Sequence, residues 1–393
     1  MTVYCFEALT AFLDSVSEKF GIPACDLLVY KDGQEVYRHM AGFADAEGTK
    51  PVSEDDLYWI FSSTKVATCT AAMQLVERGV IALEDPVSKY LPKYANLTVK
   101  QEDGSVVPAK NVMTVRHLMT MSGGLDYDMK RGSAGALAEE KGNEAGTVEI
   151  CNAYADGPLL FEPGTHFHYS LCHDVLGAVI EIASGMRFGE YMANNIFIPL
   201  GMKDTTFHPT EEQIARVSEM VTADPVTWRP TPIGKRAEMR VSGNYESGGG
   251  GLVSSTNDYI LLGAALANKG TALNGYQLLK PETVELFRTA QLDPVRKKDM
   301  MVSFPYMPGY SYALGVRTLV DDRGTPSALG HFGWDGAAGQ YILVDPDNNL
   351  TFVYSQHVRN SFATGHIVQN QLRDLVYLAL RGDLALLNEE AKA

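Results

Sequence analysis

A serine and a lysine three residues apart are the pair in this sequence best suited to chemistry. Ser62 and Lys65 lie in the run 61–65, Phe-Ser-Ser-Thr-Lys, where a helix is predicted to begin. Residues three apart on a helix share one face, so the hydroxyl and the amine can meet. A serine needs a base to become a nucleophile, and burial can lower a lysine pKa enough to supply one. Taken alone, the pattern also fits a helix cap followed by a solvated lysine.

Two later segments contain groups that such a serine would need. Tyr169, in the run 162–171, offers a phenol that could pass a proton between nucleophile and leaving group. Residues 330–336, Gly-His-Phe-Gly-Trp-Asp-Gly, set small residues beside His331 and Trp334, as at a strand edge where backbone approaches a ligand. Each segment has an ordinary alternative, because Tyr169 also fits a half-buried aromatic and 330–336 a glycine-rich bend with a solvated histidine.

The remaining patterns predict the elements that position these groups. Asp32-Gly33 suits a tight turn between two strand-like runs, and residues 345–349, Asp-Pro-Asp-Asn-Asn, suit a turn between two more. The strand-like runs are 27–30, 36–40, 340–344 and 350–354. Apolar periodicity predicts helices over 7–20, 66–79, 115–121, 174–184, 190–196 and 365–387.

The distribution of these elements predicts the domain organisation. Strands and helices occur at both ends of the 393-residue chain and mostly helices in the middle, which indicates an α/β layer interrupted by a helical region. The predicted division is an α/β sheet domain, residues 1–85 plus 245–393, and a mainly helical domain, residues 86–244. A chain of this length exceeds what one compact core usually covers.

Composition limits the partners and the compartment. The formal charge of −15 argues against nucleic-acid and anionic-membrane partners. No signal peptide is visible, no run approaches 18 apolar residues, and the five scattered cysteines favour reduced, buried thiols. We therefore expect a cytoplasmic protein that acts on a small molecule. No cofactor or metal is expected, since His166-x-His168 lacks the Asp and His that would complete a metallohydrolase motif.

The ordered set Ser62-x-x-Lys65, Tyr169-Ser170 and His331-x-Gly333 resembles the three motifs of the penicillin-recognising serine hydrolases. More specifically, the chain resembles the class C β-lactamase-like group, which includes family VIII carboxylesterases, D-alanyl-D-alanine carboxypeptidases and acyltransferases. The resemblance covers about residues 5–380. It implies a β-lactamase/transpeptidase-like α/β (α+β) fold, with a central antiparallel sheet flanked by helices and an inserted, mostly helical domain. Further segments that look like the group are 83–92, 114–124, 199–202 and 249–254.

Two departures from the β-lactamase pattern bear on the substrate. Leu171 stands where β-lactamases usually have asparagine, and His331 where the third motif usually has lysine. Those two groups hold the amide and the carboxylate of a β-lactam, so the resemblance favours another substrate here. Residues 169–177 look like the corresponding stretch of the family VIII esterases. By the same resemblance, His331 and Gly333 would line the substrate site.

The resemblance implies a role for each reactive residue. Ser62 would be the nucleophile, and Lys65 and Tyr169 would form the base pair that removes its proton. Sequence cannot decide which of the two is the resting base. The oxyanion would sit between the backbone N–H groups of Ser62 and Trp334.

The function implied is cleavage of small to medium acyl esters through an acyl-enzyme on Ser62. Acyl transfer and weak β-lactam hydrolysis are compatible with the same site. The alternatives are a D-alanyl-D-alanine carboxypeptidase, a D-aminopeptidase or a β-lactamase. A non-catalytic binding protein is disfavoured, because Ser62, Lys65 and Tyr169 are all present. The oligomeric state is left open.

Overall fold

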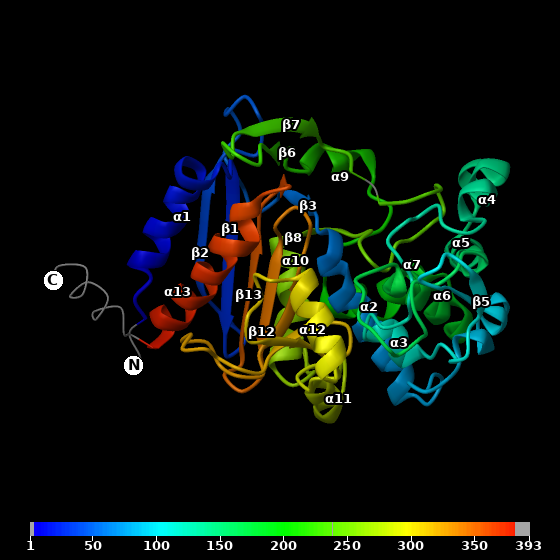
Figure 1. Ribbon diagram of the computed structural model, residues 1–393. Coiled ribbons are helices and arrows are strands. Elements are labelled where there is room, and N and C mark those ends of the chain that lie inside the picture. Colours follow the sequence, from blue (N-terminus) through cyan, green and yellow to red (C-terminus); the bar gives the residue numbers. More distant parts are fainter. Residues whose placement is uncertain (1–3, 238, 382–393) are drawn as a thin grey trace.

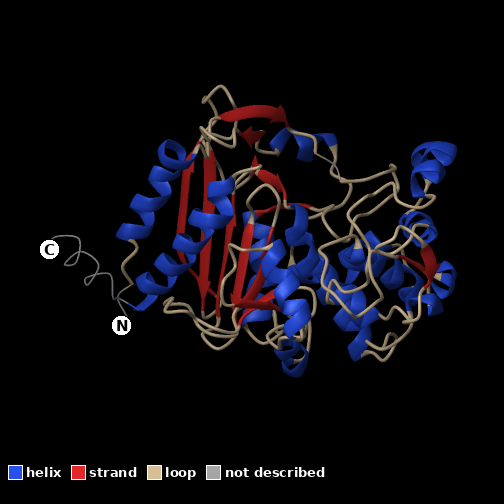
Figure 2. Cartoon of the chain, viewed as in Figure 1, coloured by secondary structure: helices blue, strands red, loops and turns tan. Residues whose placement is uncertain are grey.

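A seven-stranded antiparallel sheet forms the centre of the protein (Figures 1 and 2). The computed structural model describes residues 4–237 and 239–381. The strand order is β2-β1-β13-β12-β11-β10-β9, so the two ends of the chain share one sheet. The predicted antiparallel sheet is confirmed. Its strands are β1 (Ala24–Lys31), β2 (Gln34–Gly42), β9 (Tyr310–Tyr312), β10 (Arg317–Leu319), β11 (Phe332–Asp335), β12 (Tyr341–Asp345) and β13 (Leu350–Ser355).

The first hairpin forms as its turn residues predict. Asp32 and Gly33 join β1 to β2 with φ values of 55° and 74°, the positive pair that a two-residue hairpin turn needs. On its other edge β1 pairs with β13, from Asp26 opposite Ser355 to Lys31 opposite Leu350. The first strand along the chain is therefore held between its hairpin partner β2 and the last long strand, β13.

Helices cover both faces of the sheet. Helices α1 (Glu7–Phe20) and α13 (Gln369–Arg381) lie together on one face, and α10 (Thr256–Ala267) packs against β1, β12 and β13. Successive residues of β1 point to opposite faces of the sheet. Leu27 packs in the hydrophobic cluster beneath α1 and α13, whereas Leu28 packs in the main core on the other face.

Helix α2 (Thr64–Glu77) links the sheet to the helical region. It contacts β11 on one side and α6 (Cys172–Ser184) on the other, and its residues from Thr64 to Leu75 are buried. The predicted helix after Lys65 is thus confirmed. The other helices are α3 (Val115–Met119), α4 (Ala134–Lys141), α5 (Thr147–Ala153), α7 (Phe188–Met192), α8 (Ile198–Leu200), α9 (Glu211–Arg216), α11 (Pro281–Leu286) and α12 (Pro294–Ser303).

Short strands outside the main sheet were not predicted from the sequence. They pair as β3 (Leu57–Trp59) with β8 (Val253–Ser255), β4 (Thr98–Lys100) with β5 (Val106–Pro108), and β6 (Met220–Ala223) with both β7 (Pro230–Gly234) and β14 (Val358–Arg359). The predicted division of the chain into two domains stays a prediction.

The last predicted helix differs in detail from the structure. A π-helical turn, η7 (Thr364–Val368), leads into α13, and the predicted part beyond Arg381 lies outside the described residues. Within 4–237 and 239–381, no helix has the length and apolarity needed to cross a membrane.

Candidate active site

Ser62 stands on a strained turn at the start of α2. A single 3₁₀ turn, η1 (Phe61–Ser63), precedes the helix, and Phe61 has φ = 43°. Non-glycine residues rarely adopt this left-handed conformation, and such strain tends to occur at functional sites. The backbone N–H groups of a first helical turn have no partner within the helix. The turn therefore presents both a hydroxyl and a hydrogen-bond donor at one point.

Lys65 points its amine at the hydroxyl of Ser62. Its Nζ donates to Ser62 Oγ at 3.3 Å and to the Gly249 carbonyl at 2.5 Å. The side chain is completely buried, and this burial lowers the pKa of Lys65 to about 8, against the opposing effect of the nearby Asp174 carboxylate. Part of the amine is therefore a free base near neutral pH.

Asp174 is a buried carboxylate on α6 close to this amine. Its Oδ1 accepts hydrogen bonds from Tyr245 at 2.7 Å and from Ser247 at 2.6 Å, and its Oδ2 faces Gly249. Burial raises the pKa of Asp174, while the two hydroxyl donors and Lys65 act in the opposite direction. The carboxylate limits how far the pKa of Lys65 can fall.

Tyr169 lies in the middle of a stack of three aromatic rings. Its ring centroid is 5.7 Å from that of Tyr127 and 5.6 Å from that of Trp334, and the Trp334 indole N–H donates to the Tyr169 hydroxyl at 3.1 Å. The Lys65 Nζ is 4.6 Å from the Tyr169 ring centroid. Burial raises the pKa of Tyr169 well above its usual value, although hydrogen bonds with Ser62 and Trp334 oppose the rise. Tyr169 is thus a neutral phenol at neutral pH.

The structure brings four of the predicted residues together, but His331 is not among them. Its Nδ1–H donates to the Ala328 carbonyl at 2.8 Å, and its Nε2 accepts from the Tyr310 hydroxyl at 2.7 Å. Its ring also packs against Tyr377 of α13. His331 and Trp334 are three residues apart on an extended segment, so their side chains point to opposite faces of the sheet. The prediction that His331 lines the substrate site is therefore wrong.

The backbone N–H of Trp334 is also directed away from Ser62. The Gly336 N–H donates to the Gln340 carbonyl at 2.7 Å across the β11–β12 hairpin, and Trp334, two residues earlier, pairs with Ile342. In an antiparallel ladder residues two apart point their N–H groups to the same neighbour, so that of Trp334 also faces β12. The predicted oxyanion role of this N–H is wrong, and Trp334 reaches the site through its indole instead.

Gly336 rather than Gly333 is the glycine in contact with the nucleophile turn. A Cβ added at Gly336 would collide with the Ile60 carbonyl oxygen, whereas one added at Gly333 would collide with the Ile342 carbonyl in the neighbouring strand. Ala337 follows Gly336, and its backbone N–H donates to no other described residue. The third motif is therefore read as Trp334-x-Gly336, three residues later than predicted.

Sequence reasoning missed two further groups close to the reactive residues. The Tyr127 ring centroid lies 5.7 Å from that of Tyr169 and 5.9 Å from Lys65 Nζ. Phe304 sets its ring edge-on to that of Tyr169 at 5.2 Å. Neither residue occurs in a recognisable motif. Asp174 did carry a signal, namely an acidic residue in the first turn of a mostly apolar helix, at the start of the predicted range 174–184.

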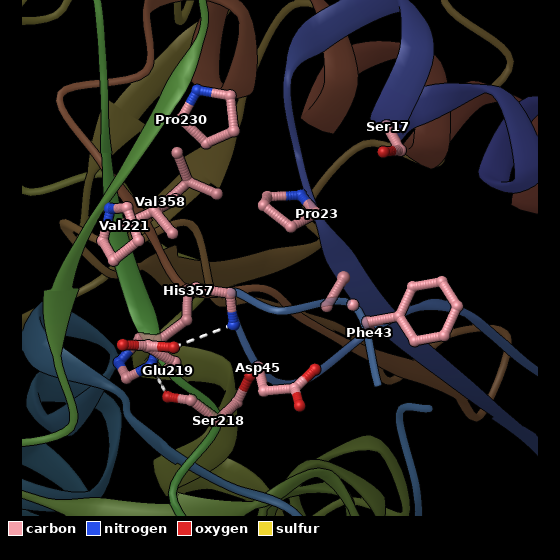
Figure 3. A pocket seen from close by; sticks show the side chains of 14 residues that line it. Ser17, Pro23, Phe43, Asp45, Ser218, Glu219, Val221, Pro230, His357 and Val358 are labelled. Atoms are coloured by element: carbon pink, nitrogen blue, oxygen red, sulfur yellow. Dashed lines mark hydrogen bonds between the residues drawn. The ribbon is translucent and has the colours of Figure 1, made fainter. Parts of the chain in front are cut away.

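A separate pocket of about 210 Å³ contains none of the predicted site residues (Figure 3). Its wall includes His357, whose Nδ1–H donates to the Ser218 carbonyl at 2.7 Å and whose Nε2 accepts from the Trp59 N–H at 3.3 Å. Burial lowers the pKa of His357 to about 4, so the ring is a neutral structural link to β3. His166 pairs with Asp299 at 2.9 Å, and the described residues contain no group of three or more side chains able to hold a metal.

Known proteins share both the sequence pattern and the fold. Esterase EstB of Burkholderia gladioli is 30% identical, over 94% of each chain. The lovastatin esterase of Penicillium rubens is 32% identical over 77% of this chain and 79% of the relative. An Escherichia coli (strain K12) relative named for D-alanyl-D-alanine carboxypeptidase activity is 29% identical over 85% of this chain and 78% of its own.

Among solved structures, EstCE1, a hydrolase with promiscuous acyltransferase activity, has a TM-score of 0.76 at 25% identity and covers 93% of this chain and 97% of its own. The family model described as Beta-lactamase matches residues 9–372. The predicted resemblance and fold class are confirmed by these matches. The chain belongs to the Beta-lactamase family.

Proposed function

We propose that the protein is a serine carboxylesterase that cleaves small to medium acyl esters through an acyl-enzyme on Ser62. The observation that carries the proposal is the buried Lys65 amine, 3.3 Å from Ser62 Oγ and with its pKa lowered to about 8. The relatives named as esterases support the same reaction, and the longest of these matches spans 94% of both chains.

Acylation begins with proton transfer from Ser62 to the free amine of Lys65. The Ser62 oxygen attacks the acyl carbon, and the negative charge that develops on the carbonyl oxygen is held by the backbone N–H groups of Ser62 and Ala337. Tyr169, neutral and hydrogen-bonded to Trp334, then relays a proton to the departing alcohol oxygen. The ester C–O bond breaks, the alcohol leaves with the proton, and the acyl group stays on Ser62.

The second half of the reaction reverses the roles. Lys65 accepts a proton from water, and the resulting hydroxide oxygen attacks the acyl carbon. The bond between the acyl carbon and Ser62 Oγ breaks, the acid is released, and Ser62 Oγ recovers its proton from Lys65. Another alcohol can take the place of water, which gives acyl transfer. The acyltransferase activity printed for EstCE1 supports this second outcome.

Esters are favoured over β-lactams and D-alanyl peptides by the second motif. Leu171, which replaces the usual asparagine, is completely buried at the start of α6. It offers no polar group to a substrate amide. A carboxypeptidase activity therefore ranks second, supported by the Escherichia coli relative. We also propose that the protein is cytoplasmic and has no nucleic-acid partner, since its net charge is strongly negative.

Initial hydrolysis rates on p-nitrophenyl esters, from acetate to decanoate, test the proposal when nitrocefin is measured alongside. We expect turnover of the short and medium esters to exceed that of nitrocefin. Leu171 and, in the reassigned third motif, Trp334 stand where β-lactamases have the asparagine and the lysine that bind a β-lactam. The best chain length would give the size of the acyl pocket. Faster turnover of nitrocefin than of every ester would overturn the esterase assignment.

The pH dependence follows from the pKa of Lys65. The amine acts as a base only after losing its proton, so kcat/KM for p-nitrophenyl acetate should rise about tenfold per pH unit below pH 8 and level off above it. Stopped-time assays between pH 6 and 9.5, corrected for spontaneous hydrolysis, would check this. A flat profile over that range would show that Lys65 is not the titrating base.

Gly336→Ala tests the third motif as reassigned. The added methyl would collide with the Ile60 carbonyl and displace the turn that presents the Ala337 N–H, so we expect a loss of roughly 100- to 1000-fold in kcat. Gly146→Ala is the matched control, because a Cβ there meets nothing within 4 Å. Equal activities of the two variants would remove Ala337 from the mechanism.

A further inference from the structure

A row of aromatic rings leads from Tyr169 to the surface. The Tyr169 ring centroid is 5.2 Å from that of Phe304, which is 6.0 Å from Tyr306. Tyr306 lies 4.9 Å from His366, and His366 stacks on Phe362 at 3.7 Å. The last ring, Phe362, is 54% exposed, although most large apolar side chains of the chain are buried. The row therefore connects the proposed proton donor with solvent.

A pocket of about 380 Å³ runs beside the outer part of this row. Tyr306, His366 and Phe362 form aromatic walls, and the Gly336–Ala337 turn forms another. The pocket thus begins at the proposed oxyanion donor Ala337 and is separate from the pocket of Figure 3, with which it shares only Val358. Gly336 also lies against Ile60, so the same turn connects this pocket with the start of the nucleophile turn.

The mechanism decides which half of an ester this pocket can hold. The departing alcohol oxygen has to receive a proton from the side of Tyr169, so the alcohol group must lie on that side of the acyl carbon. The Tyr169 ring neighbours those of Tyr127, Trp334 and Phe304. Of these, Phe304 continues through Tyr306 toward the pocket. The pocket is therefore on the alcohol side of the cleft.

The polar lining adds a constraint on charge. Asp335 accepts a hydrogen bond on Oδ1 from Arg317 at 2.6 Å, while its Oδ2 accepts none from another described residue. Arg317 is itself buried against Tyr341, 4.6 Å from the ring centroid, and is not part of the described pocket lining. Neither lysine nor arginine occurs among those lining residues, and the Asp335 carboxylate does, so the lining disfavours a carboxylate on the alcohol.

We propose that this pocket binds the alcohol half of the ester and selects aromatic alcohols without an acidic group. Aromatic rings prefer edge-to-face and offset-stacked neighbours, which Tyr306, His366 and Phe362 supply at successive depths. In the reaction the alcohol–acyl C–O bond breaks, the acyl group forms a new bond to Ser62 Oγ, and the aromatic alcohol leaves with the proton taken from Ser62. This inference rests on the proposed esterase function.

The experiment compares two acetates that differ only in the alcohol, benzyl acetate and cyclohexylmethyl acetate. Acetic acid release gives kcat/KM for each ester in the wild type, Tyr306→Leu and Phe362→Leu, with Phe43→Leu as control. Phe43 is 44% exposed and lines the pocket of Figure 3. Because the intrinsic reactivity of each ester is the same for every variant, a change in the benzyl-to-cyclohexylmethyl ratio reports the ring contacts alone.

We expect the ratio to fall about 2- to 10-fold in Tyr306→Leu and Phe362→Leu and to stay at the wild-type value in Phe43→Leu. A ratio unchanged in both pocket variants would overturn the inference. Hydrolysis of p-nitrophenyl acetate by wild type and Ser62→Ala separates this outcome from a failure of the esterase proposal. Ser62-dependent turnover with an unchanged ratio removes only the aromatic-alcohol pocket, whereas no Ser62-dependent turnover overturns both.

Discussion

Ser62→Ala is expected to lower kcat for p-nitrophenyl butyrate by roughly 10⁴- to 10⁶-fold, the loss typical of removing a nucleophile. Lys65 and Tyr169 would remain in place, but neither could form the acyl-enzyme. Stopped-flow release of p-nitrophenol, together with mass spectrometry after a brief incubation, would show whether the acylated species disappears as well.

Ser63→Ala provides the matched control for this change. Ser63 belongs to the same 3₁₀ turn, is buried, and its Oγ has no hydrogen-bond partner among the described residues. We expect it to retain activity within a few-fold of the wild type. A Ser62→Ala protein that still turns over the ester at a tenth of the wild-type rate would mean that another group is the nucleophile.

The second large effect is expected from Lys65→Met, which keeps the side-chain length but removes the amine. Losing a general base costs about 100- to 10,000-fold in rate, and the rise of kcat/KM through pH 8 should vanish with it. The same assay at pH 6, 7, 8 and 9 measures both effects. Retention of the pH-dependent rise in this variant would contradict the role given to Lys65.

Removal of the amine also affects folding, so a stability control is needed. Asp174 would lose the positive charge nearest to it, and an uncompensated buried carboxylate is destabilising. Thermal unfolding of Lys65→Met would be compared with that of Lys89→Met, in which an exposed lysine loses a surface ion pair with Asp85. The comparison would separate this effect from catalysis. Low activity counts as evidence on mechanism only at temperatures where Lys65→Met is folded.

Features encoded by local sequence could be predicted. The Asp32-Gly33 turn and the three-residue spacing of Ser62 and Lys65 depend on neighbours along the chain, and the structure shows both. The sheet and the family also followed from the order of motifs along the chain. These predictions were correct because each depends on short-range geometry or on several motifs that occur in a fixed order.

Features that depend on which way a strand faces could not be predicted. His331 and Trp334 occupy the same short run, and a shift of one residue in register exchanges the face that each side chain occupies. Only pairing with β12, Trp334 opposite Ile342, fixed the indole beside Tyr169 and left the histidine behind the sheet. Tyr127 and Phe304 reach the site from loops whose paths no local pattern encodes.

The pairing of β1 with β13 has a consequence for the synthesis of the protein. Roughly 320 residues separate Lys31 from its partner Leu350, and β11, which carries Trp334, joins the sheet through β12. At typical translation rates the ribosome needs on the order of 15–60 s to make that stretch. During this interval β1 and β2 form at most an isolated hairpin, which is only marginally stable. The nascent chain therefore carries Ser62 and Lys65 without the sheet that completes their surroundings, and ester cleavage must await a nearly finished polypeptide.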